Sequence, residues 1–336
     1  GENLFETLML NLTLLKDGTE CWGENKPCWE LDAPKSAERT EILQPDNPAQ
    51  LLTLQSRRLL LHRENGKVDG FSLLGGDFFP RESAFVEQMT IWRNATTKKN
   101  EPPVFVPCRH DAAKQFWREF PSVFCKGEGN VHQPGVVRWV EKVQQLRFLS
   151  PKRRINFRIS AVQYGDKDFF VNDSFSDSLA FQAVLLDELG RGWQNRITDE
   201  ISRCEQTASL VGHLAQDIAT AAGDKNGNAS VPARSQFYFA VDQPFRQWLR
   251  SIDPEEDDMT ETTARWQGIA RGIAEQLGQQ MVLEAGSAAL VGHRVKLDAG
   301  KKTERMELYT APKAYNRFRA GLYKLYPKTN DEGGTA

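Results

Sequence analysis

The chain has 336 residues, of which 40% are hydrophobic and 26% are charged, and its formal net charge is −2. A chain of this length usually forms two domains, because domains of about 100–200 residues are typical. The near-neutral charge argues neither for nor against nucleic-acid binding, since a local basic face is sufficient for that. The apolar runs are far shorter than the ~20 residues that cross a bilayer. The sequence therefore predicts a protein without a membrane segment.

The cysteines and the first residues indicate the cellular compartment in which the protein works. The five cysteines, at positions 21, 28, 108, 125 and 204, are odd in number and include no Cys-x-x-Cys pair. This pattern favours reduced thiols over disulfides or a zinc site. The first fifteen residues lack the basic region and cleavage site of a secretory signal, so we expect a cytoplasmic protein. Because residue 1 is Gly, we expect a fragment that lacks an upstream region.

Helical spacing of leucines predicts a short helix over residues 4–15, and a loop is expected over about 19–50. Residues 55–62 and 67–74 are rich in apolar residues and flank Glu64-Asn65-Gly66. Because Asn-Gly suits the left-handed backbone of a tight hairpin turn, this stretch predicts two antiparallel strands.

A loop-rich stretch to about residue 108 includes Thr96–Pro103. Short helices are then predicted over 112–124, with Phe116, Trp117 and Phe120 inward, and over 136–146. A second hairpin is predicted with strands at 159–164 and 169–172 around the turn residues Gly165-Asp166-Lys167. We expect it to lead directly into a long helix.

From about residue 178 the sequence predicts helices joined by loops. The first helix carries a continuous apolar stripe formed by Trp193, Ile197, Ile201, Cys204, Ala208, Val211, Leu214 and Ile218. Three more are predicted at about 234–252, with a kink at Pro244, at about 261–285, and at about 311–326, while 294–306 is expected to be a loop. Four amphipathic helices with short connections predict an antiparallel four-helix bundle over 178–328. The fold class is therefore α+β, with a mixed region over 1–177 and a disordered tail over 329–336.

Catalytic motifs are absent from the sequence, which has no phosphate-binding loop, dinucleotide fingerprint, nucleophile elbow or His-Glu-x-x-His pair. The nearest catalytic pattern is His110-Asp111, which could bind a metal in a phosphohydrolase. Such sites need further ligands, and the other histidines have no acidic partner at ligand spacing. The acidic run Asp253–Asp258 lacks the spacing of a calcium loop and suits a solvated helix start. We therefore expect no catalytic residue, metal or cofactor.

Motif order along the chain resembles a known family. Leu51-Leu-Thr-Leu-Gln-Ser-Arg-Arg-Leu-Leu-Leu61 is followed by Met89-Thr-Ile-Trp-Arg93 and a Lys-Lys loop. Phe116-Trp-Arg-Glu-Phe120 and the Gln163-Tyr164 hairpin come next, before the long helix. This order resembles the CasA family over essentially the whole chain. CasA proteins are the large subunits of the type I-E CRISPR surveillance complex, Cascade.

The resemblance implies a non-catalytic subunit that recognises the protospacer-adjacent motif in double-stranded DNA and helps to open the duplex for pairing with guide RNA. It implies as partners the guide-RNA-containing Cascade subunits, including the small subunits, and a recruited helicase–nuclease. Residues 1–177 would be the C-terminal part of the mixed large-subunit domain. The family's loop lysine falls on Lys98 or Lys99, and the residues leave that choice open.

The family's strand-separating hairpin tip, which uses an amide side chain, falls on Asp166, Lys167, Asp168 and Phe169. Asp168 departs from that pattern because phosphates would repel its carboxylate. Lys167 or Phe169 could act as the wedge instead, or the preferred motif could differ, and apolar wedges are known to unstack base steps.

The family's glycine-rich loop and N-terminal docking loop are not visible here, so the resemblance places them upstream of residue 1. We therefore expect weak duplex binding by the chain alone. The helical region would contact the small subunits and help to hold a DNA strand, for which Arg191, Arg196, Arg203 and Arg246 are candidates. Two alternatives remain open: an assembly scaffold without DNA readout, and a metal phosphohydrolase at His110 and Asp111.

Overall fold

The computed structural model describes residues 57–75, 92–96, 105–107, 111, 113–125, 131–132, 135–165, 171–224, 228–297 and 305–327. It contains helices and short antiparallel strand pairs, which confirms the α+β class. The chain divides into two compact units, one formed by Gly1–Ser178 with Gln182–Gln194 and the other by Leu179–Phe181 with Asn195–Ala336. The predicted helix at 4–15, the loop at 19–50 and the tail at 329–336 lie outside the described residues.

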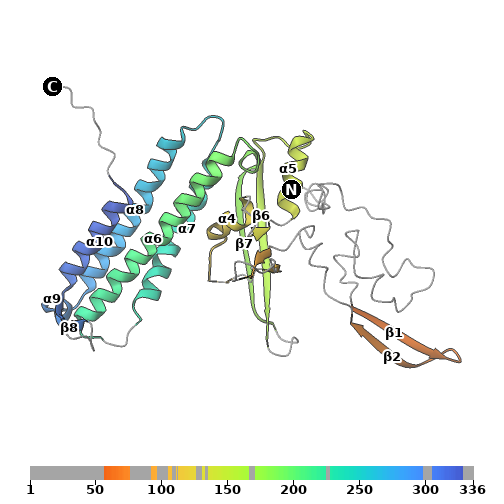
Figure 1. The fold of residues 1–336 in the computed structure, drawn as a ribbon, viewed down its shortest axis with the longest axis horizontal. Coiled ribbons are helices and arrows are strands. Elements are labelled where there is room, and N and C mark those ends of the chain that lie inside the picture. The colour runs from red at the N-terminus through yellow and green to blue at the C-terminus, as the bar shows by residue number, and fades with distance from the viewer. Residues whose placement is uncertain are drawn as a thin grey trace. The chain divides into compact units, whose positions relative to one another are not determined.

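The Asn-Gly hairpin is confirmed. Strands β1 (Arg57–Glu64) and β2 (Lys67–Gly75) pair antiparallel, with Glu64 opposite Lys67 and Arg57 opposite Gly75 (Figure 1). Asn65 and Gly66 have φ values of 50° and 77°, the left-handed pair that the tight turn requires. A bulge interrupts the register between His62 and Arg63.

The short helices of the first unit enclose an aromatic core. The helical part of the predicted 112–124 segment is limited to η3 (Phe116–Glu119) and α4 (Phe120–Phe124). Pro121 occupies the first turn of α4, where its missing N–H needs no partner. Phe116, Trp117 and Phe120 are buried as predicted. Helix α5 (Gly135–Gln145) matches the prediction at 136–146.

Strand β7 corrects the expectation that a hairpin leads straight into a helix. The hairpin strands are β6 (Arg154–Tyr164) and β7 (Val171–Gln182), and the 3-10 helix η4 (Ala183–Leu186) precedes α6 (Arg191–Ala221). Helices therefore do not begin at residue 178. The physical reason is the alternation along the strand, which buries Leu179 and Phe181 two residues apart, as a strand does and a helix does not.

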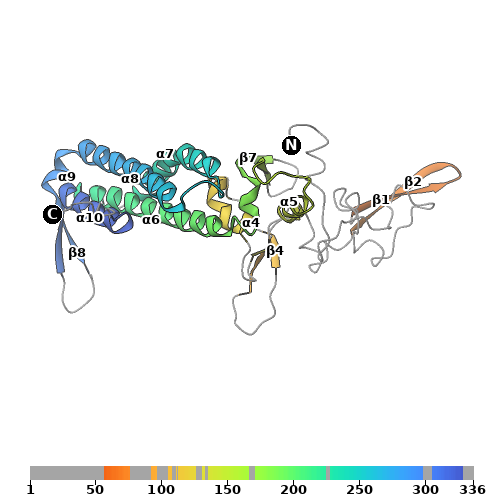
Figure 2. The same cartoon turned by 90° about the horizontal axis from the view of Figure 1, so that it is seen from above.

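The second unit is dominated by α6 and three further long helices, α7 (Ser230–Ser251), α8 (Met259–Glu284) and α10 (Ala311–Leu325). They run side by side in both views (Figures 1 and 2). Trp248 of α7 stacks on Trp266 of α8, with ring centroids 5.3 Å apart. The hydroxyl groups of Thr207 on α6 and Tyr326 after α10 lie 2.9 Å apart. The assignment of these helices as an antiparallel four-helix bundle stays a prediction.

Helix ends and connections follow the local chemistry of the sequence. Asp258 of the acidic run accepts a hydrogen bond from the Glu261 backbone N–H at 2.8 Å and so caps α8. Helix α7 continues through Pro244.

The expected loop at 294–306 is wrong at its two ends, while residues 298–304 lie outside the described residues. After α9 (Ser287–Val291) the chain forms β8 (His293–Leu297) and β9 (Arg305–Tyr309), which pair antiparallel. Each strand alternates polar and apolar residues over only four positions, 294–297 in β8 and 305–308 in β9. So short an alternation did not predict strands, because the connection between β8 and β9 contains a glycine and lysines that are typical of a loop.

Candidate nucleic-acid interface

The candidate interface is built on the hairpin formed by β6 and β7, whose strands run antiparallel. Arg158 Nε donates to Ser176 Oγ at 3.1 Å, and the hydroxyls of Ser160 and Ser176 lie 3.4 Å apart. Further along, a Cβ on Gly165 would lie 3.1 Å from Oδ1 of Asn172. As residue numbers rise along β6, those of the neighbouring residues on β7 fall, so the two strands are antiparallel. They form a two-stranded sheet (Figure 1).

The base of this hairpin is fixed to the aromatic core of the first unit. Ile155 and Phe157 on β6 are buried, and the rings of Phe157 and Phe124 meet edge to face with centroids 4.8 Å apart. On β7, Asp177 Oδ2 accepts a hydrogen bond from the Phe116 backbone N–H at 2.8 Å. Apolar packing and a charged hydrogen bond thus hold both strands.

A second set of hydrogen bonds fixes the ends of the strands away from the tip. The backbone N–H of Ala183 donates to the Arg153 carbonyl at 2.8 Å, and that of Val184 donates to the Pro151 carbonyl at 2.9 Å. Gln144 on α5 donates to the Ala183 carbonyl at 2.8 Å. The base of the hairpin is therefore held by contacts with α5, η3, α4 and η4.

Several side chains described in the distal half of the hairpin are exposed. Val162 on β6 and residues 171–174 on β7 are all exposed, although both strands continue there. The two strands thus extend beyond the core that holds their base. The candidate tip residues Asp166, Lys167, Asp168 and Phe169 belong to the connection between these strand ends and lie outside the described residues.

The candidate lysines belong to a different connection in the same unit. Strands β3 (Trp92–Asn94) and β4 (Phe105–Pro107) pair antiparallel, with Asn94 opposite Phe105, and β5 (Val131–His132) pairs with the other edge of β3. The chain between β3 and β4 contains Lys98 and Lys99, which lie outside the described residues. The assignment of these lysines and of the hairpin tip to DNA binding stays a prediction.

Three of the four arginines considered for strand binding make contacts within the protein. Arg203 donates to the Leu325 carbonyl and to Glu200, and its guanidinium lies over the Tyr326 ring. Arg246 pairs with Asp242 at 2.9 Å and Arg191 with Glu188 at 3.8 Å. At least Arg203 therefore ties α6 to the end of α10.

A buried carboxylate on α6 was missed by the sequence analysis. Glu200 is fully buried and accepts a hydrogen bond from Gln267 of α8 at 2.7 Å. Burial raises its pKa above the usual range of a glutamate, and the Gln267 hydrogen bond and the Arg203 charge oppose that rise only in part. The spacing of apolar residues could not predict the burial of Glu200, because a charged residue does not contribute to that pattern.

The phosphohydrolase alternative gains no support from the part of the chain that is described. Asp111 Oδ1 accepts a hydrogen bond from the Ala113 backbone N–H at 2.9 Å, a turn-capping role. His110 lies outside the described residues. Among the described residues, no three His, Cys, Asp or Glu side chains are grouped as a metal site would need. None of the described helices is both long enough and apolar enough to cross a membrane.

Comparison with protein families identifies the chain. A family model described as CRISPR-associated protein Cse1 matches residues 1–277. The chain belongs to the Cse1 family. A solved structure of Thermobifida fusca Cse1 is similar, with 28% sequence identity, a TM-score of 0.76, and coverage of 97% of this chain and 62% of that chain.

More distant Cse1 structures share the fold. Cse1 from Acidimicrobium ferrooxidans has 22% identity and a TM-score of 0.70. The structure of Thermus thermophilus CasA (Cse1) has 16% identity and a TM-score of 0.59. Each of the two covers 97% of this chain, and the chain spans 62% of each of them. A comparison with curated proteins gave no match. The resemblance to CasA is thus confirmed for the family.

Proposed function

We propose that this Cse1-family chain is part of the non-catalytic large subunit of a type I-E CRISPR surveillance complex. In that role it recognises the protospacer-adjacent motif in double-stranded DNA and helps to open the duplex for pairing with guide RNA. It also helps to recruit the helicase–nuclease. The proposed partners are target DNA, the guide-RNA-containing subunits with their small subunits, and that nuclease.

The observation that carries this proposal is the anchored β6–β7 hairpin. Its base is fixed by Phe157, Asp177 and Ala183, while its distal strands are exposed. An element that separates DNA strands must resist the force of restacking bases, so a rigid base is what it needs. In guide-RNA systems the protein reads only a short duplex element, and base pairing reads the rest of the target.

The sequence at the end of this hairpin offers two chemistries for a wedge. Lys167 could pair with a phosphate or a base-edge acceptor, and Phe169 could unstack a base step. Asp168 would be repelled by phosphates and could accept only from an amino group on a base edge. We therefore propose that Lys167 or Phe169 performs the opening and that Lys98 or Lys99 contacts the motif duplex.

The test is a salt-dependent gel shift with the assembled complex on duplexes that differ only in the flanking motif. We expect a Lys98→Ala/Lys99→Ala variant to lose affinity and a Lys167–Phe169 alanine variant to lose duplex opening, read by permanganate footprinting of unpaired thymines. Lys324→Ala, at an exposed position on α10, is the matched control. Unchanged affinity and motif preference in both variants would contradict the recognition role and favour the assembly-scaffold alternative.

A further inference from the structure

The side chains of the β6–β7 hairpin divide between two faces of different character. Successive side chains along a strand point to opposite sides, so the buried Ile155 and Phe157 define an inner face. Arg158 donates to the Ser176 hydroxyl across the strands, which places both residues on the opposite face, called the outer face. By the same alternation, the outer face consists of Arg154, Asn156, Arg158, Ser160 and Val162 on β6 and of Asn172, Ser174, Ser176 and Ser178 on β7.

The outer face carries positive charge and uncharged hydrogen-bonding groups. Arg154 and Arg158 are both exposed, and the residues between and opposite them bear amides or hydroxyls. The described residues of the two strands include two carboxylates, Asp173 and Asp177, and both occupy positions of the inner face. The cations of the hairpin are therefore separated from its acids by the sheet itself.

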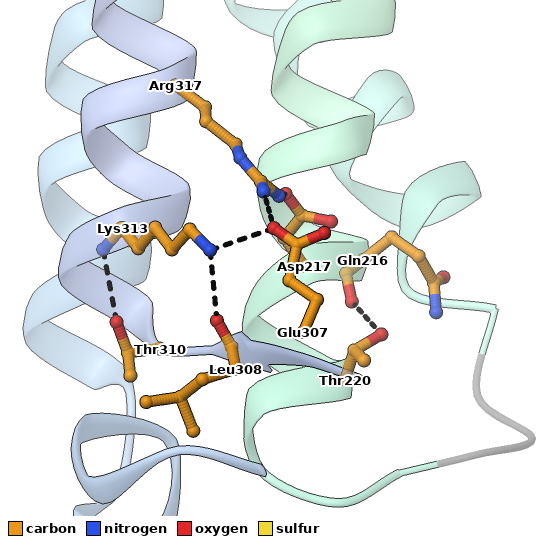
Figure 3. Close-up of polar contacts among 8 residues, drawn as sticks. All are labelled: Gln216, Asp217, Thr220, Glu307, Leu308, Thr310, Lys313 and Arg317. Carbon is orange, nitrogen blue, oxygen red and sulfur yellow. Dashed lines mark hydrogen bonds and ion pairs between the residues drawn. The ribbon is translucent and has the colours of Figure 1, made fainter. Parts of the chain in front are cut away.

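Neither arginine of the outer face is neutralised within the described part of the chain. Arg158 makes its hydrogen bond to a serine hydroxyl, and no described carboxylate forms an ion pair with Arg154 or Arg158. Arg317 of α10 shows the contrasting arrangement, because it pairs with Glu307 of β9 and Asp217 of α6 (Figure 3). Arg317 holds the fold together, whereas the outer-face arginines keep their charge available for a ligand.

The spacing and chemistry of the outer face match a nucleic-acid backbone. Arg154 and Arg158 are four residues apart on one strand, which is about 13 Å. A stacked nucleic-acid strand spans that distance with about four nucleotides. Arginine, serine and asparagine are side chains that contact phosphates and sugars. A protein partner fits less well, because Val162 is the one large apolar side chain among the described residues of this face, and protein interfaces have apolar and aromatic centres.

We propose that the outer face of the β6–β7 hairpin binds the sugar–phosphate backbone of one DNA strand after the duplex has opened at the hairpin tip. Arg154 and Arg158 contact its phosphates. The face starts beside the proposed tip, since β6 ends at Tyr164 and β7 begins at Val171, so a strand that leaves the tip meets it directly. Backbone contacts of this kind carry no base preference, and they oppose reannealing of the opened strands. The inference rests on the proposed function.

Cross-linking from the outer face identifies its occupant. p-Azidophenylalanine is placed at Ser174 of the full-length protein, and at the adjacent Asp173, also exposed but on the inner face, as the control. In the assembled complex, the target strand, the displaced strand and the guide RNA carry different labels. We expect position 174 to cross-link one of the two DNA strands, named by its label, and only on duplexes that permanganate shows to be open. Cross-links only to protein or RNA, an equal DNA yield from position 173, or an equal yield on a duplex that cannot open overturns the inference.

The salt dependence of binding tests the role of the charge, on a duplex pre-opened by mismatches beside the motif. Arg154→Ala/Arg158→Ala should reduce the slope of log affinity against log salt by about 1.4, because each phosphate contact on a single strand adds about 0.7. Arg154→Lys/Arg158→Lys should keep the slope, because lysine still pairs with phosphate as a point charge. Arg265→Ala/Lys324→Ala removes two exposed cations elsewhere and should match the wild type. A wild-type slope in the alanine variant, or a reduced slope in the lysine variant, contradicts the inference.

The outcomes also separate this inference from the proposed function. If the wild-type complex binds and opens motif-bearing duplexes but position 174 gives no DNA cross-link, only the strand path along the outer face is wrong. If the wild-type complex neither binds nor opens them, the proposed function and the strand path fail together.

Discussion

Glu200 shows how one buried side chain makes stability depend on pH. Its pKa is raised by burial, so the native state binds the proton more tightly than the unfolded chain does. We therefore expect the contribution of Glu200 to the free energy of unfolding to fall as pH rises from about 4.3, the usual glutamate value, through its raised pKa. Asp217, whose pKa is also raised by burial, acts in the same direction.

Replacing Glu200 by glutamine should remove its part of this pH dependence. We expect Glu200→Gln to gain stability relative to the wild type as pH rises above the usual glutamate value, because the amide has no charge to desolvate. Urea unfolding at a series of pH values measures the difference. The exposed Glu284→Gln serves as control. A Glu200→Gln difference that does not vary with pH would show that this carboxylate does not resist ionisation.

Two glycines of α8 should respond in opposite ways to the same substitution. A Cβ at Gly278 would overlap the Phe318 ring of α10, whereas a Cβ at Gly268 would meet open space. We expect Gly278→Ala to lower the unfolding free energy by about 1–3 kcal/mol through overpacking. Gly268→Ala should raise it by about 0.5–1 kcal/mol, because alanine loses less backbone entropy in a helix. Thermal or urea unfolding checks both, and equal signs would refute the packing argument.

At the scale of elements, the β6–β7 hairpin should show a gradient of stability from base to tip. Phe157→Ala removes a buried ring that packs on Phe124 and should cost about 3–5 kcal/mol. Val162→Ala in the exposed distal half should change stability by less than about 0.5 kcal/mol. Chemical unfolding of the two variants measures the gradient. A large cost at Val162 would mean that the distal strands pack on something within the chain.

Local signals predicted most elements but not all of their ends. Asn65-Gly66 predicts the β1–β2 turn because these two residues readily adopt the left-handed backbone conformation. The apolar stripe from Trp193 to Ile218 predicts α6 by its helical spacing. Strands β8 and β9 were missed because five residues give too short an alternation to outweigh a glycine- and lysine-containing connection. The extension of β7 to Gln182 depends on burial of Leu179 and Phe181, which only packing supplies.

At the scale of the whole molecule, the net charge of −2 means that the proposed DNA binding would depend on a few local cations. Each lysine that neutralises a phosphate adds about 0.9 to the slope of log affinity against log salt. If Lys98, Lys99 or both contact phosphates, the double alanine variant of the assembled complex should show a slope smaller by about 0.9 for one contact or about 1.8 for two. If one of them reads a base, motif preference should relax by about 1–3 kcal/mol instead.

Filter binding across a salt series, on duplexes with matched and altered motifs, distinguishes these contacts. Lys324→Ala should leave both the slope and the preference unchanged. A double variant with an unaltered slope and an unaltered preference would remove the lysines from the interface.

The sequence by itself determined the α+β class, the Asn-Gly hairpin, the long helices and the membership of the Cse1 family. These follow from turn residues, from apolar spacing and from motif order, which are all local. Tertiary structure alone decided that Phe157 and Asp177 hold the base of the β6–β7 hairpin, that Glu200 is buried beside Gln267, and that Arg317 ties β9 to α6. The physical reason is that each of these contacts joins residues distant in the chain, and their pairing is selected by packing and desolvation that no local pattern encodes.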